Sequence, residues 1–156
     1  MFTRTCSALA ALLVATAGLA ACSSRPPQRS TASLTRAYLG IATPANRVLE
    51  KSFDALEDED DDLDASAALL RTIAMTERAF DRDLFALKLP ARFGGTARAL
   101  VHANEARADL TELAMSATTV ASLDTYEVGM DAMNPPVEVQ VRALRSALGL
   151  PPPDTD

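Results

Sequence analysis

His102 is the only histidine in the chain and the side chain best suited to bind a transition metal. Glu105 and Asp109 follow it by three and seven residues, which places all three on one face of a helix. That face also carries Arg98 and Glu112, away from the apolar positions. Metal sites of helical bundles instead use ligands that converge from several helices into the core. We therefore predict a solvated polar face, with no metal ion and no cofactor.

A second candidate for ion binding is the acidic run at residues 57–64, which holds seven Asp or Glu residues. An EF-hand calcium loop beginning at Asp58 would place Leu63 where the motif requires glycine and Leu69 where it requires glutamate. The motif therefore fails. We interpret the run as a solvated turn whose last acids complement the positive end of the following helix.

The third chemical signal is Leu19-Ala20-Ala21-Cys22, which closes the apolar stretch at residues 8–21. This stretch has the length and the small-residue ending of a secretory signal and is short for a membrane span. The four residues resemble a bacterial lipobox. The resemblance implies thioether lipidation of Cys22, cleavage before it, and N-acylation with a chain such as palmitate. An ordinary N-terminal membrane helix with a chance cysteine is the alternative.

These features predict four segments: a lipoprotein signal peptide at residues 1–21, a flexible tether at 22–33, a bundle at 34–149 and a disordered tail at 150–156. Several acyl chains would hold the mature protein firmly to the cell membrane, on its extracytoplasmic face. Cys6 would leave with the signal, and Cys22 would be alkylated. The mature domain would then contain no thiol, which excludes disulfides, metal-thiolate sites and cysteine nucleophiles.

Composition indicates an all-α protein, because β-branched runs with two-residue alternation are missing and helix-forming residues are abundant. Acidic residues outnumber basic ones by 21 to 15, an excess that argues against a nucleic-acid partner and against adhesion to anionic headgroups. Apolar periodicity predicts helices over residues 34–56, 62–87, 96–118 and 123–148. Their short connections predict an antiparallel up-down four-helix bundle, with kinks near Pro44 and Pro135-Pro136.

Two charged residues fall within otherwise apolar helical faces, Glu77 in the second helix and Arg107 in the third. Each turn of an antiparallel bundle reverses the direction of the chain. Counting residues from the turns therefore places Glu77 and Arg107 at the same level along the bundle axis as Pro44 and Pro135. We predict that Glu77 and Arg107 face each other inside the bundle, where carbonyls released by the prolines accept the remaining guanidinium donors. Either a structural ion pair or a ligand site would explain such a pair, and the structural role is favoured.

Three segments together resemble uncharacterised lipoproteins of actinobacteria: the Leu-Ala-Ala-Cys lipobox, residues 38–46 (YLGIATPAN) and residues 141–151 (VRALRSALGLP). The resemblance implies an envelope lipoprotein and transfers no catalytic residue. The Pro135-Pro136 pair departs from the smooth last helix expected of such a protein.

The favoured hypothesis is therefore a non-enzymatic, lipid-anchored bundle that binds a protein or small-molecule partner. A carrier of an apolar molecule between the helices is an alternative, although alanine-rich helix faces normally pack closed. An enzyme is less favoured, because the chain has no Gly-x-Ser-x-Gly nucleophile motif.

Overall fold

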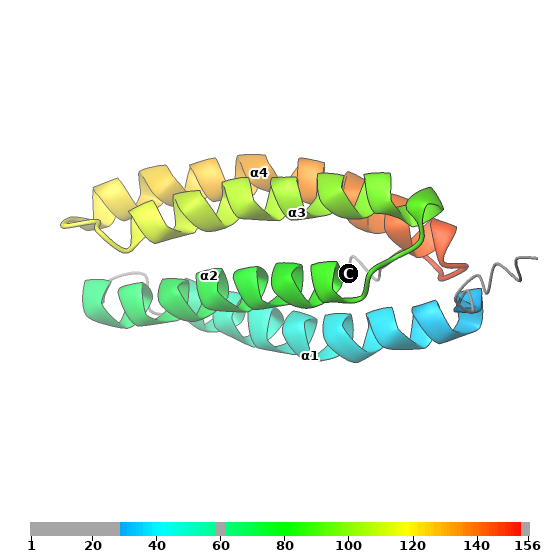
Figure 1. Ribbon diagram of the computed structural model, residues 1–156. Helices are drawn as coiled ribbons and strands as arrows, with labels where there is room; N and C mark the ends of the chain where they lie inside the picture. The colour runs from blue at the N-terminus through cyan, green and yellow to red at the C-terminus, as the bar shows by residue number, and fades with distance from the viewer. Residues whose placement is uncertain (1–28, 59–61, 154–156) are drawn as a thin grey trace, which may run out of the picture.

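The protein is an antiparallel bundle of four helices (Figure 1). The computed structural model describes residues 29–58 and 62–153, and within these residues it contains no β-strand. The helices are α1 (Thr31–Asp58), α2 (Leu63–Ala86), α3 (Ala91–Ala114) and α4 (Val120–Ala147). The predicted all-α, up-down architecture is confirmed. No described helix combines the length and the hydropathy needed to cross a membrane.

Close packing joins α1 to α2, α2 to α3 and α3 to α4, whereas α1 and α4 have no comparably close backbone approach. Figure 1 shows the start of α1, the turn between α2 and α3 and the end of α4 at one end of the bundle. The end of α1, the start of α2 and the turn between α3 and α4 lie at the opposite end. The face between α1 and α4, which we call the seam, is therefore the loosest of the four helix boundaries.

Prolines lie inside two of the helices without ending them. α1 runs through Pro44, and α4 runs through Pro135-Pro136. A proline removes one backbone donor and crowds the carbonyl four residues back. Apolar residues on both sides of each proline, including Tyr38 and Leu56 in α1, are buried and hold the helix to its neighbours. Tertiary packing thus outweighs the local cost, and a true break of the last helix is not observed.

The predicted helix ends need correction at three starts. α1 begins at Thr31, because Ser30 accepts from the backbone N–H of Ser33 through both its hydroxyl and its carbonyl oxygen. The tether prediction therefore extended too far. α3 begins at Ala91 rather than residue 96, since buried Phe93 anchors the first turn ahead of the glycine pair. α4 begins after Thr119, which forms a capping box with Ser122.

The predicted disordered tail from residue 150 also needs correction. Leu148 is followed by Gly149 with φ of +73°, and the N–H groups of Gly149 and Leu150 donate to the carbonyls of Ser146 and Arg145. This pair of bonds is a Schellman motif. Leu150 packs on the core, and the Arg145 Nε donates to the carbonyl of Pro151 at 2.7 Å. The chain is consequently held against the bundle as far as residue 153.

The apolar core is divided into two clusters, one toward each end of the bundle. One cluster is centred on Leu34, Leu100 and Leu144, and the other on Leu70 and Leu123. Between them lie polar side chains of α2, α3 and α4, which we call the polar layer: Glu77, Asp81, Asn104, Arg107 and Asn134. Buried polar groups cost stability unless they are paired, so this layer is the part of the fold that packing alone does not explain.

Candidate functional site

Glu77 of α2 and Arg107 of α3 are brought together inside the bundle. Oε1 of Glu77 lies 2.5 Å from Nη2 of Arg107, and the two side chains are 1% and 13% exposed. Each residue sits on the apolar arc of its helix, so folding those arcs against each other buries both charges. Burial of one charge without the other would cost several kcal/mol. The pair is therefore a coupled element of the core.

The acceptor for the second guanidinium nitrogen differs from the expectation. Nη1 of Arg107 donates to the side-chain Oδ1 of Asn134 at 2.8 Å, rather than to a carbonyl released by a proline. Asn134 directly precedes Pro135, so the prediction found the correct height on α4 but the wrong kind of acceptor. Nε of Arg107 is buried and has no hydrogen-bond partner among the described residues.

The carboxylate of Glu77 is incompletely satisfied. Neither of its oxygens accepts a hydrogen bond of normal angular geometry from the described residues, so the contact with Arg107 is an ion pair by distance alone. Burial raises the pKa of Glu77, and the charge of Arg107 opposes that rise. A buried acceptor without a donor is costly. Glu77 is consequently a group to which a bound donor would add stability.

Asp81 and Asn104 form the neighbouring part of the polar layer, one helical turn from the ion pair. Nδ2 of Asn104 donates to Oδ1 of Asp81 at 2.8 Å, and the other carboxylate oxygen of Asp81 is buried without a partner. Burial raises the pKa of Asp81 to about 6, partly offset by the bond from Asn104. Sequence reasoning missed both residues. Asp81 follows Glu77 by four residues and therefore lies on the same helix face, a signal that was present.

Two cavities open from the polar layer toward the seam. The larger has a volume of about 300 Å³ and lies between α1 and α4, with α3 at its base. The smaller has a volume of about 80 Å³, and Glu77, Asn104 and Pro153 contribute to its lining. Arg107 lines both cavities. The Arg107 side chain is thus part of the wall of both cavities.

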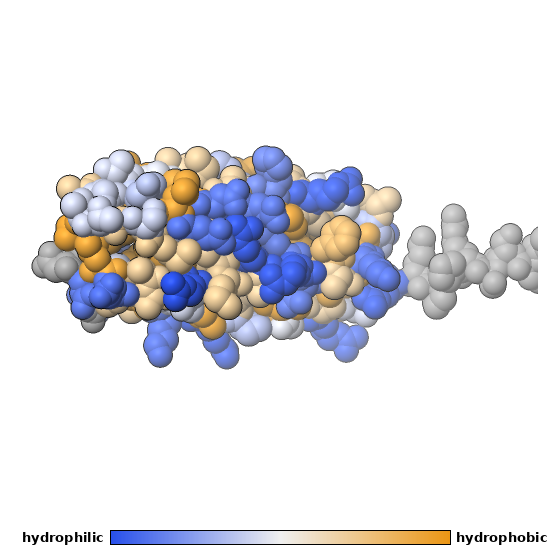
Figure 2. All heavy atoms as spheres, turned by 60° about the vertical axis from the view of Figure 1, so that its left-hand side comes forward, coloured by the Kyte–Doolittle hydropathy of each residue, from blue (hydrophilic) through white to orange (hydrophobic). Residues whose placement is uncertain are grey.

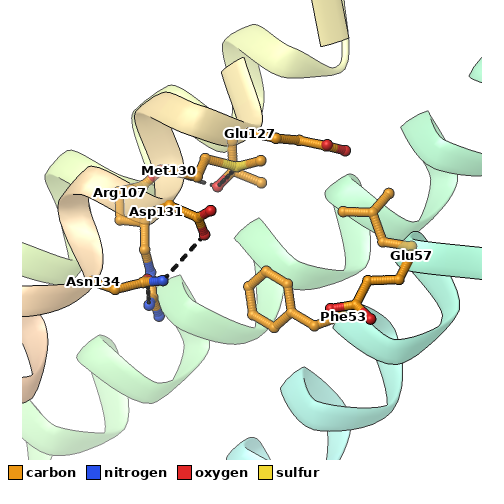
Figure 3. Close-up of a pocket in the computed structure, with 9 residues that line it drawn as sticks. Phe53, Glu57, Arg107, Glu127, Met130, Asp131 and Asn134 are labelled. Carbon is orange, nitrogen blue, oxygen red and sulfur yellow. Dashed lines mark hydrogen bonds between the residues drawn. The ribbon is translucent and has the colours of Figure 1, made fainter. Parts of the chain in front are cut away.

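The larger cavity is acidic. Glu57 at the end of α1 and Glu127 on α4 approach it from opposite sides, and Asp131 lies beside Asn134 (Figure 3). Nδ2 of Asn134 donates to Oδ1 of Asp131 at 3.5 Å. The only cation in the lining is Arg107, whose charge already faces Glu77. The cavity therefore favours positively charged or donor-rich groups over anions.

The remaining sequence candidates lie elsewhere. His102 and Glu105 line a surface groove between α2 and α3, while Asp109 and Glu112 accept hydrogen bonds from Arg78 at 2.7 and 3.0 Å. No set of three His, Cys, Asp or Glu residues is arranged to hold a metal ion within the described parts of the chain. Cys22 falls outside the described residues, so its lipidation stays a prediction.

Comparison with known proteins adds no assignment: no protein-family model matches the chain, and neither a curated protein nor a solved structure matches it. The four-helix bundle with a polar layer and an acidic seam is thus the class that the geometry defines. Any function has to be argued from the site itself.

Proposed function

We propose that this protein is a lipid-anchored lipoprotein on the extracytoplasmic face of the cell membrane, and that its helical bundle binds a small molecule in the seam without catalysing a reaction. The order Leu19-Ala20-Ala21-Cys22 supports the anchor, as does the likeness to actinobacterial lipoproteins. The binding role rests on the polar layer, since an anchor needs no buried ion pair beside two cavities.

The observation that carries the binding role is the carboxylate of Glu77. It is 99% buried, lines the smaller cavity and lacks hydrogen bonds of normal geometry. A ligand that donates N–H or O–H bonds would satisfy these acceptors, whereas the described residues give Oε1 only its ion pair with Arg107 and give Oε2 no donor. Donation to a charged acceptor is the stronger kind of hydrogen bond.

The larger cavity indicates the chemistry of the rest of the ligand. Its volume of about 300 Å³ is at the lower end of the range for small-molecule sites. Glu57, Glu127 and Asp131 line it, so a small organic amine fits the lining better than an anion does. The same carboxylates disfavour the alternative of a carrier for a purely apolar molecule.

The enzyme alternative receives less support from the site. The polar layer holds two carboxylates, an amide pair and a guanidinium, but the chain shows no activated nucleophile motif. Buried ion pairs also occur in proteins with a purely structural need for them. The experiment must therefore distinguish a ligand-binding site from an ion pair that only stabilises the packing of the helices.

Substitution of the pair makes this separation. Glu77→Leu alone should lower the free energy of unfolding by about 3 to 5 kcal/mol, because it strands the buried guanidinium, whereas Glu77→Leu with Arg107→Leu should be nearly neutral. Native mass spectrometry of the full protein from its own envelope should then show a bound small molecule on the wild type. The stable double variant should lack it.

Leu70→Ala provides the matched control. Leu70 is fully buried in the apolar cluster that also contains Leu123, and it lines neither cavity. Its truncation should lower the free energy of unfolding by about 2 to 5 kcal/mol, while the bound small molecule remains. A wild-type protein without added mass, or a double variant that keeps the mass, would contradict a ligand site at this pair.

A further inference from the structure

Charge is strongly separated along the bundle. The half at which α1 begins comprises residues 29–44, 75–104 and 135–153 and contains nine Lys or Arg against four Asp or Glu. We call this half the basic end. The other described half contains four Lys or Arg against twelve Asp or Glu. The acidic excess of the whole chain thus conceals a cationic surface at one end.

The basic end also carries an apolar surface groove. This groove has a volume of about 590 Å³ and lies between α2 and α3, with Leu84, Leu89 and Val101 in its lining. Phe85 at its edge is 80% exposed, the most exposed large apolar side chain among the described residues. The face drawn in Figure 2 is a mosaic in which apolar side chains lie between hydrophilic ones. An exposed phenylalanine beside an apolar groove is typical of an interaction site.

Cations flank this groove. Lys88 and Arg98 line it and are exposed, and Glu105 is its only acidic residue. Arg92 does not belong to this rim, because its Nη2 donates to Oγ1 of Thr31 on α1 at 3.3 Å. A basic rim around apolar groups is the arrangement that suits an anionic lipid surface, where headgroups pair with cations and rings enter the acyl boundary.

The path of the chain brings the groove close to any membrane anchor. Arg29, the first described residue, donates from Nη1 to the carbonyl of Leu87 at 3.4 Å, in the turn between α2 and α3. Only six residues separate Arg29 from Cys22. At about 3 Å per residue of extended chain, a lipid on Cys22 would hold this turn within roughly 20 Å of the bilayer.

We infer that the α2–α3 face of the basic end docks on an anionic lipid surface, with Phe85 inserted at the acyl boundary and Lys88 and Arg98 against headgroups. This role is separate from ligand binding in the seam. It depends on the proposed lipid anchor only because the anchor would bring the protein to the bilayer. Because α2 and α3 lie opposite the boundary between α1 and α4, docking leaves the seam facing away from the membrane.

The chain contains no tryptophan, so a single introduced tryptophan reports on its own surroundings. The full protein with Phe85→Trp is reconstituted with vesicles of phosphatidylcholine, with or without phosphatidylglycerol, that carry brominated acyl chains. Phe85→Trp fluorescence should be strongly quenched on the phosphatidylglycerol vesicles, and salt should weaken the quenching. Val128→Trp, at a 71% exposed site on α4 in the acidic half, should remain unquenched.

Charge variants with equal change in net charge test the rim. Lys88→Glu with Arg98→Glu should reduce quenching of the Phe85→Trp signal several-fold. Arg47→Glu with Lys51→Glu, at the opposite end of α1, should leave it unchanged. Flotation of the full protein without quenching at position 85, or equal quenching at positions 85 and 128, would overturn the docking face alone. Failure to float with the phosphatidylglycerol vesicles would overturn the docking face and the anchor together.

Discussion

Asp81 is a buried carboxyl group whose ionisation should affect the stability of the fold. It is 4% exposed, and burial raises its pKa from 3.8 to about 6. A folded-state pKa above the unfolded value means that the native protein binds the proton more tightly. The free energy of unfolding therefore falls as pH rises from 3.8 to about 6, which is the reverse of ordinary acid denaturation. The raised pKa of Glu77 acts in the same direction.

We predict that the free energy of unfolding increases as pH falls from 7 to 5, and that Asp81→Asn removes much of this dependence. A shift of about two pKa units corresponds to about 3 kcal/mol, so Asp81→Asn should be more stable than the wild type at pH 7 by up to that amount. The amide keeps an acceptor for Asn104 without the charge. Urea unfolding at several pH values measures the effect.

Asp83→Asn is the control, because Asp83 is an exposed neighbour on the same helix. It should leave the pH dependence as in the wild type. A wild-type stability that rises steadily from pH 5 to pH 7 would contradict the linkage.

At the scale of the helices, two of the C-terminal ends, those of α2 and α4, are followed by a residue with positive φ. Gly149 ends α4 at φ +73°, where glycine has no steric cost. Lys88 follows the C-cap of α2 at φ +48°, and it is the one non-glycine residue in this conformation in the described chain. Left-handed backbone costs a residue with a Cβ about 1 to 2 kcal/mol. Lys88 is therefore a strained position at the edge of the apolar groove.

Opposite substitutions at these two sites should have opposite effects. Lys88→Gly should raise the free energy of unfolding by about 1 kcal/mol, and Gly149→Ala should lower it by about 1 kcal/mol. Thermal unfolding of the two variants measures this. A destabilised Lys88→Gly protein would show that the lysine side chain contributes more to folding than its backbone conformation costs.

At the scale of the whole molecule, the proposed docking would orient the bundle on the membrane through its separated charges and through the entry of the chain at the basic end. Such electrostatic attraction is screened by salt, whereas acyl chains are not released by it. The anchor and the docking face can therefore be distinguished by a salt wash.

We predict that Cys22→Ser leaves the protein unprocessed or releases it from the membrane fraction after a high-salt wash, whereas the wild type remains bound. The substitution would remove the thiol that is predicted to carry the thioether lipid, and with it the predicted signal for cleavage. Fractionation of native cells with detection of the mature N-terminus measures this. A Cys22→Ser protein cleaved at the same site and still sedimenting after the wash would refute the lipid anchor.

Local pattern was sufficient for the helical class and for the pairing of Glu77 with Arg107. The apolar periodicity of each helix can be recognised in a few turns of sequence. A charged residue within the apolar face is buried when that face packs, and it then requires an oppositely charged or hydrogen-bonding partner. The helix starts were less predictable, since buried Phe93 and the capping box at Thr119 act through contacts that propensity does not weigh.

Only the tertiary structure decided what surrounds the pair and where the surface charges gather. Asn134 reaches Arg107 because α3 and α4 meet at one height, and Asp81 meets Asn104 because α2 and α3 do. The seam exists because α1 and α4 stay apart while the other neighbours close. The net charge of the sequence does not show where the charges lie. Antiparallel packing brings most basic residues to one end of the bundle and most acidic residues to the other. Sequence spacing determines which face of a helix a residue occupies, but only packing determines which residues of other helices share that height.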